Sequence, residues 1–473
     1  MRRLLPLLFL SALALPSAAT AATGDPLERR ELATGIRLSV LTVADAPLQT
    51  FFAFVPTGLA HDDAGRAQWS HLLEHMAIRT TDPEGLTDGE IRFNGETGDG
   101  SLRFDVHAPP AQAPLAAAKL CAWLSAFEFD PEILATEQRK IAGELGATAP
   151  RGFGHKWATA AWAQVVRHGA REVTVQGDVD RATVEAVAAH ADRVLHLGQA
   201  MAIYAAGPLS AEEVARLFDG QLASGGGLDS LANALGGNPR AAKQAPPAAG
   251  AAADRALDPA LAPIPRDPAT GLALGEHVAS WDLPRPHVLE WYLLPDVTPV
   301  DRLTAATLAG VLGMTLAQDR KLQEAGIVAL ASSEISLPAG RVLLFSASLP
   351  DGVDPGATAA KARIAFRSAI EGLGKAPPFR SLDEVVALTR RELEGGLPDL
   401  AVLRRQMAGR PNAELIDAQV VLGLAHREWS MRLTLPQLSA AAKQLAAPAL
   451  SDFVTLRLAA PAANVVLLRP RNG

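Results

Sequence analysis

The sequence predicts an α+β protein of two homologous domains, each a mainly antiparallel sheet packed against helices. Short β-rich runs with alternating apolar residues are separated by longer stretches with helical periodicity. A segment rich in Gly, Pro and Ala interrupts the chain near its middle. The two flanking halves end in similar patterns of helix, short element and strand, which indicates a duplicated domain of about 200 residues.

The first half carries clear start and turn signals. Gly98 and Gly100 mark the turn of an expected hairpin, and Asp130 and Pro131 provide an N-cap and a first helical residue. The expected elements are strands over residues 36–43 and within QTFFAFVPTG, a helix over 68–78, a hairpin over 91–108, helices over 111–127 and 131–145, a strand in AMAIYAAG and a helix from Leu209.

The first 21 residues have the pattern of a secretory signal peptide. Two arginines precede an apolar run from Leu4 to Leu15, and small residues follow up to Ala21. This run is too short for a membrane anchor, which takes roughly 20 apolar residues. We therefore expect cleavage of residues 1–21 and a periplasmic or secreted protein. No later segment looks long and apolar enough to span a membrane.

The remaining chain divides into three expected parts. We place a first domain over residues 24–222, a flexible linker over 223–271 and a second homologous domain over 272–473. The linker has no sustained periodicity, and structured patterning resumes at Leu272.

The amino-acid composition and net charge exclude some classes of function. The chain has 473 residues, of which 48% are hydrophobic, so a large core is available. Loss of the leader removes two arginines and changes the formal net charge from −7 to −9. With no long basic run, nucleic acid and anionic membrane surfaces are poor candidate partners. The single cysteine, Cys121, cannot form an internal disulfide and is predicted to be a small core residue.

Residues 71–75 read HLLEH, which suggests a metal site. On a helix, His71 and His75 share a face about 6 Å apart and can bind one ion. Glu74 lies beside them, where a general base for a zinc-activated water is needed. This spacing is the inverted zincin signature. The alternative is an ordinary amphipathic helix, because the leucines between these residues form an apolar stripe in either case.

A catalytic zinc ion needs a third protein ligand. The helix expected over 131–145 offers Glu137 and Glu144, which are two helical turns apart and share a face. Either glutamate alone would ordinarily belong to a solvated helix face. From spacing alone, either glutamate could be the third ligand.

HLLEHMAIRTT, the following hairpin and the paired glutamates resemble the pitrilysin/insulinase/mitochondrial processing peptidase family, in its bacterial two-domain form. FNGET is similar to the family's Asn-Ala-x-Thr strand, with Gly95 in place of Ala. LAGVLGMTLAQDRKLQEAGIVALAS resembles the family's helix leading to a Gly-Leu-Ala-Tyr strand. The resemblance covers nearly the whole mature chain and implies two halves that close like a clam around a peptide.

The resemblance also implies roles for single residues. His71, His75 and Glu144 would bind one Zn²⁺ per chain. Glu74 would activate the water, and Glu137 would orient a histidine. The segment between the last histidine and the third ligand is a little shorter than the family usually has.

A second implication concerns the substrate. Asn94 and Thr97 lie on the strand to which an extended peptide would add by main-chain pairing. The family also uses an arginine and a tyrosine from its C-terminal half to bind the substrate carbonyl. Here Ala329 falls at the tyrosine position, and Leu322 or Gln323 at the arginine position.

This departure predicts a heterodimer in which a second family subunit supplies the missing arginine and tyrosine. Two alternatives stay open: the pair is dispensable, or the correspondence of positions is shifted. The leading function is thus a zinc metalloendopeptidase. The competing functions are a non-catalytic scaffold or assembly subunit, and a zinc hydrolase that acts on another amide. His155 is a further histidine that could lie near the site.

Overall fold

The computed structural model describes residues 25–81, 91–125, 130–148, 155–195, 201–223, 266–268, 270–294, 298–337, 340–375, 379–394, 397, 399–458 and 464–471. These residues form two compact units. One contains residues 27–286 with 417–425 and 466–473, and the other contains 287–416 with 426–465. The predicted signal peptide lies outside the described residues, as do residues 224–265 of the predicted linker; Ala223 belongs to the helix that ends there, and Arg266 forms a β-bridge with Ala273.

The first unit is built on a six-stranded sheet in the order β1-β2-β7-β3-β5-β4. All neighbours are antiparallel except β2 and β7, which run parallel. The prediction of a mainly antiparallel sheet is therefore confirmed. The strands are β1 (Glu28–Glu31), β2 (Arg37–Thr42), β3 (Gln49–Val55), β4 (Arg92–Thr97), β5 (Leu102–Ala108) and β7 (Ala202–Gly207).

One face of this sheet is covered by the helices α1 (Trp69–Thr81), α2 (Ala113–Ser125) and α7 (Ala211–Ala223). Trp123 on α2 contacts Phe93 and Phe104 on the sheet, with ring centroids 5.4 and 6.1 Å apart. Cys121 is buried on the same helix, and burial raises the pKa of its thiol to about 12. Its predicted place in the core is confirmed.

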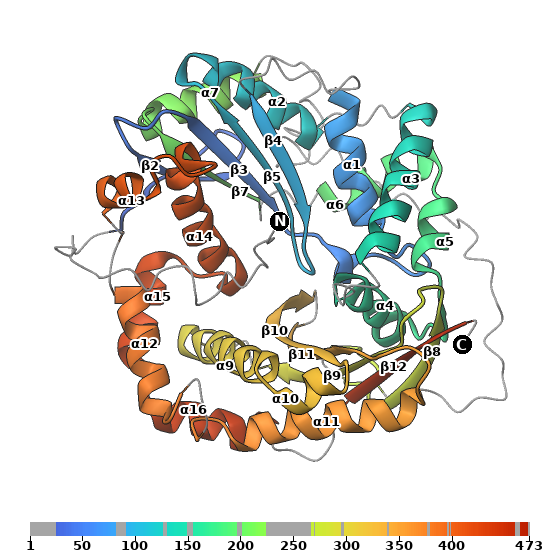
Figure 1. Ribbon diagram of the computed structural model, residues 1–473. Helices are drawn as coiled ribbons and strands as arrows, with labels where there is room; N and C mark the ends of the chain where they lie inside the picture. Colours follow the sequence, from blue (N-terminus) through green and yellow to red (C-terminus); the bar gives the residue numbers. More distant parts are fainter. Residues whose placement is uncertain are drawn as a thin grey trace. The chain divides into compact units, whose positions relative to one another are not determined.

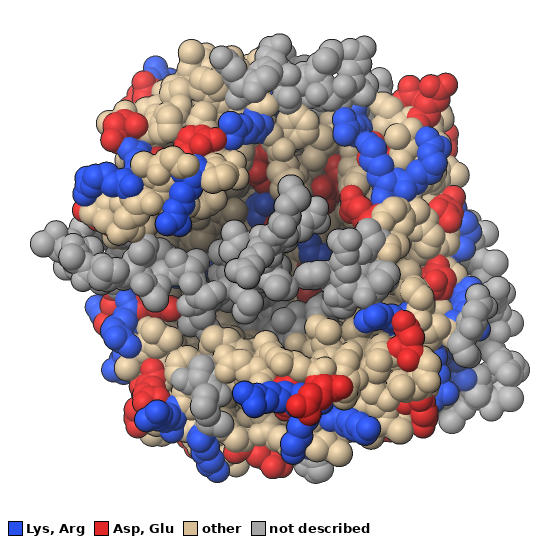
Figure 2. All heavy atoms as spheres, viewed as in Figure 1, with Lys and Arg blue, Asp and Glu red and all other residues tan. Residues whose placement is uncertain are grey.

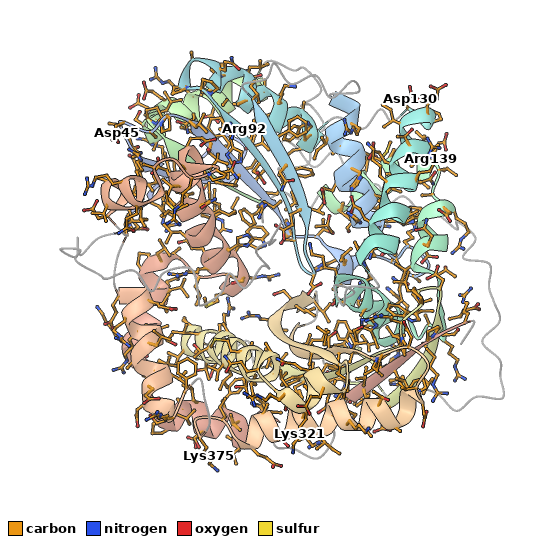
Figure 3. All side chains as sticks on the ribbon, in the orientation of Figure 1. Asp45, Arg92, Asp130, Arg139, Lys321 and Lys375 are labelled. Atoms are coloured by element: carbon orange, nitrogen blue, oxygen red, sulfur yellow. The ribbon has the colours of Figure 1, made fainter. Side chains whose placement is uncertain are left out.

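Helix α3 (Pro131–Thr148) lies beside α1, as Figure 1 shows. Asp130, labelled in Figure 3 at the start of α3, accepts a hydrogen bond from the backbone N–H of Glu132 at 2.7 Å, so the predicted N-cap is present. The remaining elements of the unit are α4 (His155–His168), β6 (Glu172–Val173), α5 (Val175–Asp180), α6 (Val184–Leu195) and β8 (Glu276–Trp281), of which β6 and β8 pair in parallel.

The second unit contains the antiparallel run β10-β11-β9. Helices pack against these strands, so this unit also matches the predicted α+β type. Its elements are β9 (His287–Leu294), α9 (Pro299–Ala317), α10 (Arg320–Glu324), β10 (Val328–Leu337), β11 (Gly340–Ser348), α11 (Pro355–Glu371), α12 (Leu382–Glu394), α13 (Leu400–Met407), α15 (Leu435–Gln444) and α16 (Ala447–Phe453). The remaining elements are helix α14 (Ile416–Met431), whose residues are divided between the two units, and strand β12 (Asn464–Pro470).

Helix α9 has the length and apolar composition of a membrane span, although we expected no such segment after the predicted signal peptide. It packs against β10, α11 and α15. This is the environment of a core helix, and core helices share the length and composition of a span. On the face shown in Figure 2, basic and acidic side chains are interspersed, in keeping with the absence of basic runs in the sequence.

Candidate metal centre

The start of α1 is fixed by a buried carboxylate from the preceding loop. Asp62 accepts hydrogen bonds from the backbone N–H of Ser70 at 3.0 Å and from its hydroxyl at 2.6 Å. Asp62 is fully buried, and this burial raises its pKa to about 7. The carboxylate thus holds the first turn of the helix that carries the HLLEH residues.

His71, His75 and Glu144 bring three potential ligand atoms within 4.8 Å of one another. Nε2 of His71 lies 3.3 Å from Oε2 of Glu144, and Nε2 of His75 lies 3.7 Å from Oε1. The two imidazole rings are 4.8 Å apart and nearly perpendicular, at 88°. Two imidazole nitrogens and one carboxylate oxygen form a donor set that suits zinc and leaves a fourth position for water or substrate.

The centre is buried on one side and open on the other. His71 is 6% exposed, and its ring stacks on Trp157 at a centroid distance of 5.3 Å. The side chain of Glu144 is 48% exposed. A small molecule or peptide can therefore approach from the side of Glu144, while the histidines stay fixed.

Glu137 contacts the other ring nitrogen of His75, with Oε2 2.9 Å from Nδ1. Its side chain is 3% exposed and is also bound by Lys140 and by Arg79, whose Nε lies 3.5 Å away. Burial acts to raise the pKa of Glu137, but the hydrogen bonds from His75 and Lys140 outweigh it, so the pKa is lowered. Glu137 therefore faces Nδ1, whereas Glu144 faces Nε2 of both rings.

The carboxylates around His75 favour a positive charge at this point. Burial acts to lower the pKa of His75, yet the hydrogen bond with Glu137 and the charges of Glu74 and Glu144 raise it overall. The pKa of Glu144 is lowered, chiefly by its hydrogen bond with His71. The same field that favours a proton would favour a divalent cation.

Glu74 lies against strand β4. The hydroxyl of Thr97 donates a hydrogen bond of 2.6 Å to Oε2 of Glu74. A Cβ atom at Gly95 would overlap Oε1 of the same carboxylate, so the missing side chain makes room for it. The family resemblance implied that Thr97 takes part in peptide binding, whereas in the structure its hydroxyl is hydrogen-bonded to Glu74.

Asn94 is exposed on β4, which is the edge strand of its sheet. Successive side chains on a strand point to opposite faces. Because Gly95 and Thr97 face Glu74, the side chain of Asn94 points to the other face. The structure therefore brings Thr97 to the centre but not the amide of Asn94, although the main chain of β4 remains an edge.

Gln68 was not anticipated from the sequence. Its Oε1 lies 3.2 Å from Nδ1 of His71, and it precedes the first residue of α1. Only its position three residues before a candidate ligand could have drawn attention to it. The side chain of His155 lies outside what the structure describes, so its proximity to the centre stays a prediction.

The positions of the second unit expected for arginine and tyrosine hold neither residue type. Ala329 is on β10, Leu322 is buried on α10, and Gln323 donates a 2.7 Å hydrogen bond to the carbonyl of Ala317. The only tyrosines of the chain, Tyr204 and Tyr292, are 3% and 4% exposed. Burial prevents either hydroxyl from reaching a peptide in this conformation.

Several solved peptidases share this architecture. A protease from Helicobacter pylori matches with a TM-score of 0.55 at 14% identity, covering 94% of this chain and 100% of that one. The inactive domain of a peptidase from Pseudomonas fluorescens matches with a TM-score of 0.56 at 11% identity, covering 94% and 97%. The periplasmic protease PqqL from Escherichia coli matches with a TM-score of 0.51 at 15% identity, covering 98% of this chain and 48% of that one.

No protein-family model matches the chain, and no curated protein sequence does so. At identities of 11–15%, the structural likeness establishes the fold. The chain has the mixed helix-and-sheet fold of these peptidases, one of which is described as inactive.

Proposed function

We propose that this protein is a zinc metalloendopeptidase of the pitrilysin/insulinase type that cleaves extended peptides. The observation that carries the proposal is the meeting of His71, His75 and Glu144, which come from two helices. Two imidazoles and a half-exposed carboxylate are suited to a catalytic zinc ion. The shared peptidase fold supports the choice of substrate class.

Zinc at this centre would supply a Lewis acid that acidifies a water molecule and polarises the scissile carbonyl. Glu74 would take a proton from the attacking water and deliver it to the leaving nitrogen. Thr97 holds Oε2 of Glu74, so we assign the proton transfer to Oε1. Glu137 would keep the ring of His75 in place through Nδ1.

The peptide would add to the exposed edge of β4 and pair with its main chain. Asn94 would then contact a substrate side chain on the face away from Glu74. In this arrangement the edge strand positions the peptide, and Gly95 and Thr97 position the base.

The second subunit of a heterodimer would supply the arginine and tyrosine that the C-terminal half lacks. Ala329 and the two buried tyrosines support this part of the proposal. The leader-like residues 1–21 and the periplasmic E. coli neighbour support a periplasmic or secreted location.

A non-catalytic scaffold subunit is the second candidate function. It is favoured by the same missing donors and by the likeness to a domain described as inactive. A scaffold has no need of the three converging ligands, so zinc content separates the two functions.

The decisive variant is Glu74→Gln, with Glu132→Gln on the exposed start of α3 as a matched control. Both variants should bind one zinc ion per chain. Turnover of a mixed peptide library, assayed with the partner subunit where one co-purifies, should be lost in Glu74→Gln and kept in Glu132→Gln. Equal cleavage by Glu74→Gln and the wild type would overturn the mechanism.

A further inference from the structure

Gln68 has an unusual backbone conformation for a buried residue with a side chain. Its φ is +73°, in the left-handed region that favours glycine. The other described non-glycine residues with positive φ, Asn412 and Arg432, are exposed. Gln68 is 0% exposed. A glycine would adopt this backbone without steric cost, so the retained side chain needs a reason.

The residues on both sides of Gln68 enforce its conformation. The backbone N–H of Ala67 donates to Oδ2 of Asp178 at 3.0 Å, and the indole Nε1 of Trp69 donates to the Asp178 carbonyl at 2.9 Å. The guanidinium of Arg66 lies 4.7 Å from the centre of the Trp69 ring. Contacts on both sides of Gln68 therefore fix the backbone, and strained conformations persist in folded proteins where the surroundings fix them in this way.

The side chain of Gln68 makes one directed contact. Its Oε1 lies 3.2 Å from Nδ1 of His71. A carbonyl oxygen can only accept, so Nδ1 of His71 carries the hydrogen and donates it. In a metal-bound ring the lone pair is then on Nε2, the nitrogen that lies 3.3 Å from Oε2 of Glu144. Among the described residues, Nε2 of Gln68 itself has no hydrogen-bond partner, although it is buried.

We propose that Gln68 is a positioning residue that fixes the tautomer and ring orientation of His71, so that Nε2 presents its lone pair to a metal ion. This inference rests on the proposed zinc function. Backbone strain and an unsatisfied buried amide both oppose a glutamine here, and the contact with His71 accounts for it. Gln68 thus does for His71 what Glu137 does for His75, but without adding a negative charge.

The test measures zinc affinity of the full chain by competition with a chromophoric chelator. Gln68→Met keeps the length of the side chain but removes the acceptor, and zinc should bind 10- to 100-fold more weakly, as expected when an outer-shell partner is lost. Gln68→Glu keeps an acceptor and should bind zinc at least as tightly as the wild type. Gln444→Met, on an exposed glutamine of α15, is the control and should change nothing.

Gln68→Gly separates positioning from a merely structural role. It relieves the positive φ, so the melting temperature of the metal-free protein should be no lower than that of the wild type. Zinc affinity should still fall 10- to 100-fold. A structural role alone would lower melting temperature and affinity together, and that result would contradict the inference.

His71→Ala distinguishes the inference from the function on which it rests. If His71→Ala loses zinc while Gln68→Met and Gln68→Gly bind it normally, the inference is wrong and the zinc centre stands. If the wild type binds no zinc, or His71→Ala binds it as tightly as the wild type, the proposed function fails and the inference fails with it.

Discussion

Helices α1 and α9 each pack against strands of their own unit, but different kinds of contact fix their first turns. Helix α9 starts with a local capping box, in which Thr298 and Asp301 exchange hydrogen bonds of 3.1 Å. Helix α1 starts after the strained Gln68, and its first turn is bound by Asp62 from an earlier loop. Only α1 carries the histidines and the candidate base.

The difference shows how the candidate site is specified. The start of α9 is set by residues three positions apart, and the helix buries apolar side chains. The start of α1 depends on Asp62 and on Asp178, which is more than 100 residues away in sequence. A helix that must place ligands within a few tenths of an ångström is thus positioned by tertiary contacts.

The largest expected effect comes from removing a ligand on α1. His75→Ala should abolish zinc binding and reduce peptide turnover to background, because only two ligands would remain. His277→Ala, on a half-buried histidine that contacts the carbonyl of Leu274, should keep both properties. Metal analysis and a peptide assay check this prediction, and retained zinc in His75→Ala would contradict it.

The next effect concerns the close approach of Glu74 to β4. Gly95→Ala should make the flexible end of Glu74 shift and so lower kcat, by at most roughly the 100-fold that a misplacement of about 1 Å costs. Zinc content should stay unchanged. Gly146→Ala, where a Cβ meets nothing within 4 Å, is the control and should keep full kcat. Unchanged kcat in Gly95→Ala would show that Glu74 need not lie here.

The buried capping carboxylate of α1 should give stability an unusual pH dependence. The pKa of Asp62 is raised to about 7, so its contribution is present below pH 3.8 and is lost as pH rises through 7. The pKa of buried His190 is lowered to about 3, chiefly by burial, so its contribution falls as pH drops from 6.5 towards 3. The two effects oppose each other over the shared range, and the groups titrate as a coupled pair because Nε2 of His190 lies 3.8 Å from Oδ1 of Asp62.

Asp62→Asn should therefore expose the His190 effect. Relative to the wild type, the variant should gain up to about 4 kcal/mol of unfolding free energy between pH 4 and pH 7. Urea unfolding at several pH values measures this difference. Parallel pH profiles for the two proteins would show that Asp62 is ionised throughout this range, which would contradict the prediction.

The smallest effect is expected at α9. Thr298→Ala removes both hydrogen bonds of the Thr298 hydroxyl with Asp301 and should cost about 1 kcal/mol, as N-cap substitutions usually do. Zinc affinity and turnover should be unchanged. A loss of zinc in this variant would mean that the two helices are less independent than the comparison implies.

The elements that follow local rules could be predicted from the sequence. Asp130 and Pro131 marked the start of α3, and the alternating residues of β2 and the β-rich residues of β3 marked strands, because caps and local composition depend on near neighbours. The apolar length of α9 is also a local property and was overlooked, whereas its packing against β10, α11 and α15 could come only from the structure.

The candidate site was predictable only in part. The spacing of HLLEH and the two-turn separation of Glu137 and Glu144 are local, and the structure brings three of these side chains together. The contact of Thr97 with Glu74 depends on how β4 lies against α1. The backbone conformation of Gln68 depends on Asp178, which binds the residues on either side of it. Neither could follow from spacing alone, because each requires the tertiary fold.

Anomalous diffraction at the zinc edge, from crystals of the purified chain grown with zinc, tests the central claim most directly. The account predicts one strong peak, bounded by Nε2 of His71, Nε2 of His75 and the carboxylate of Glu144. A zinc-containing crystal with no peak at these three side chains, or with its only peak elsewhere, would contradict it.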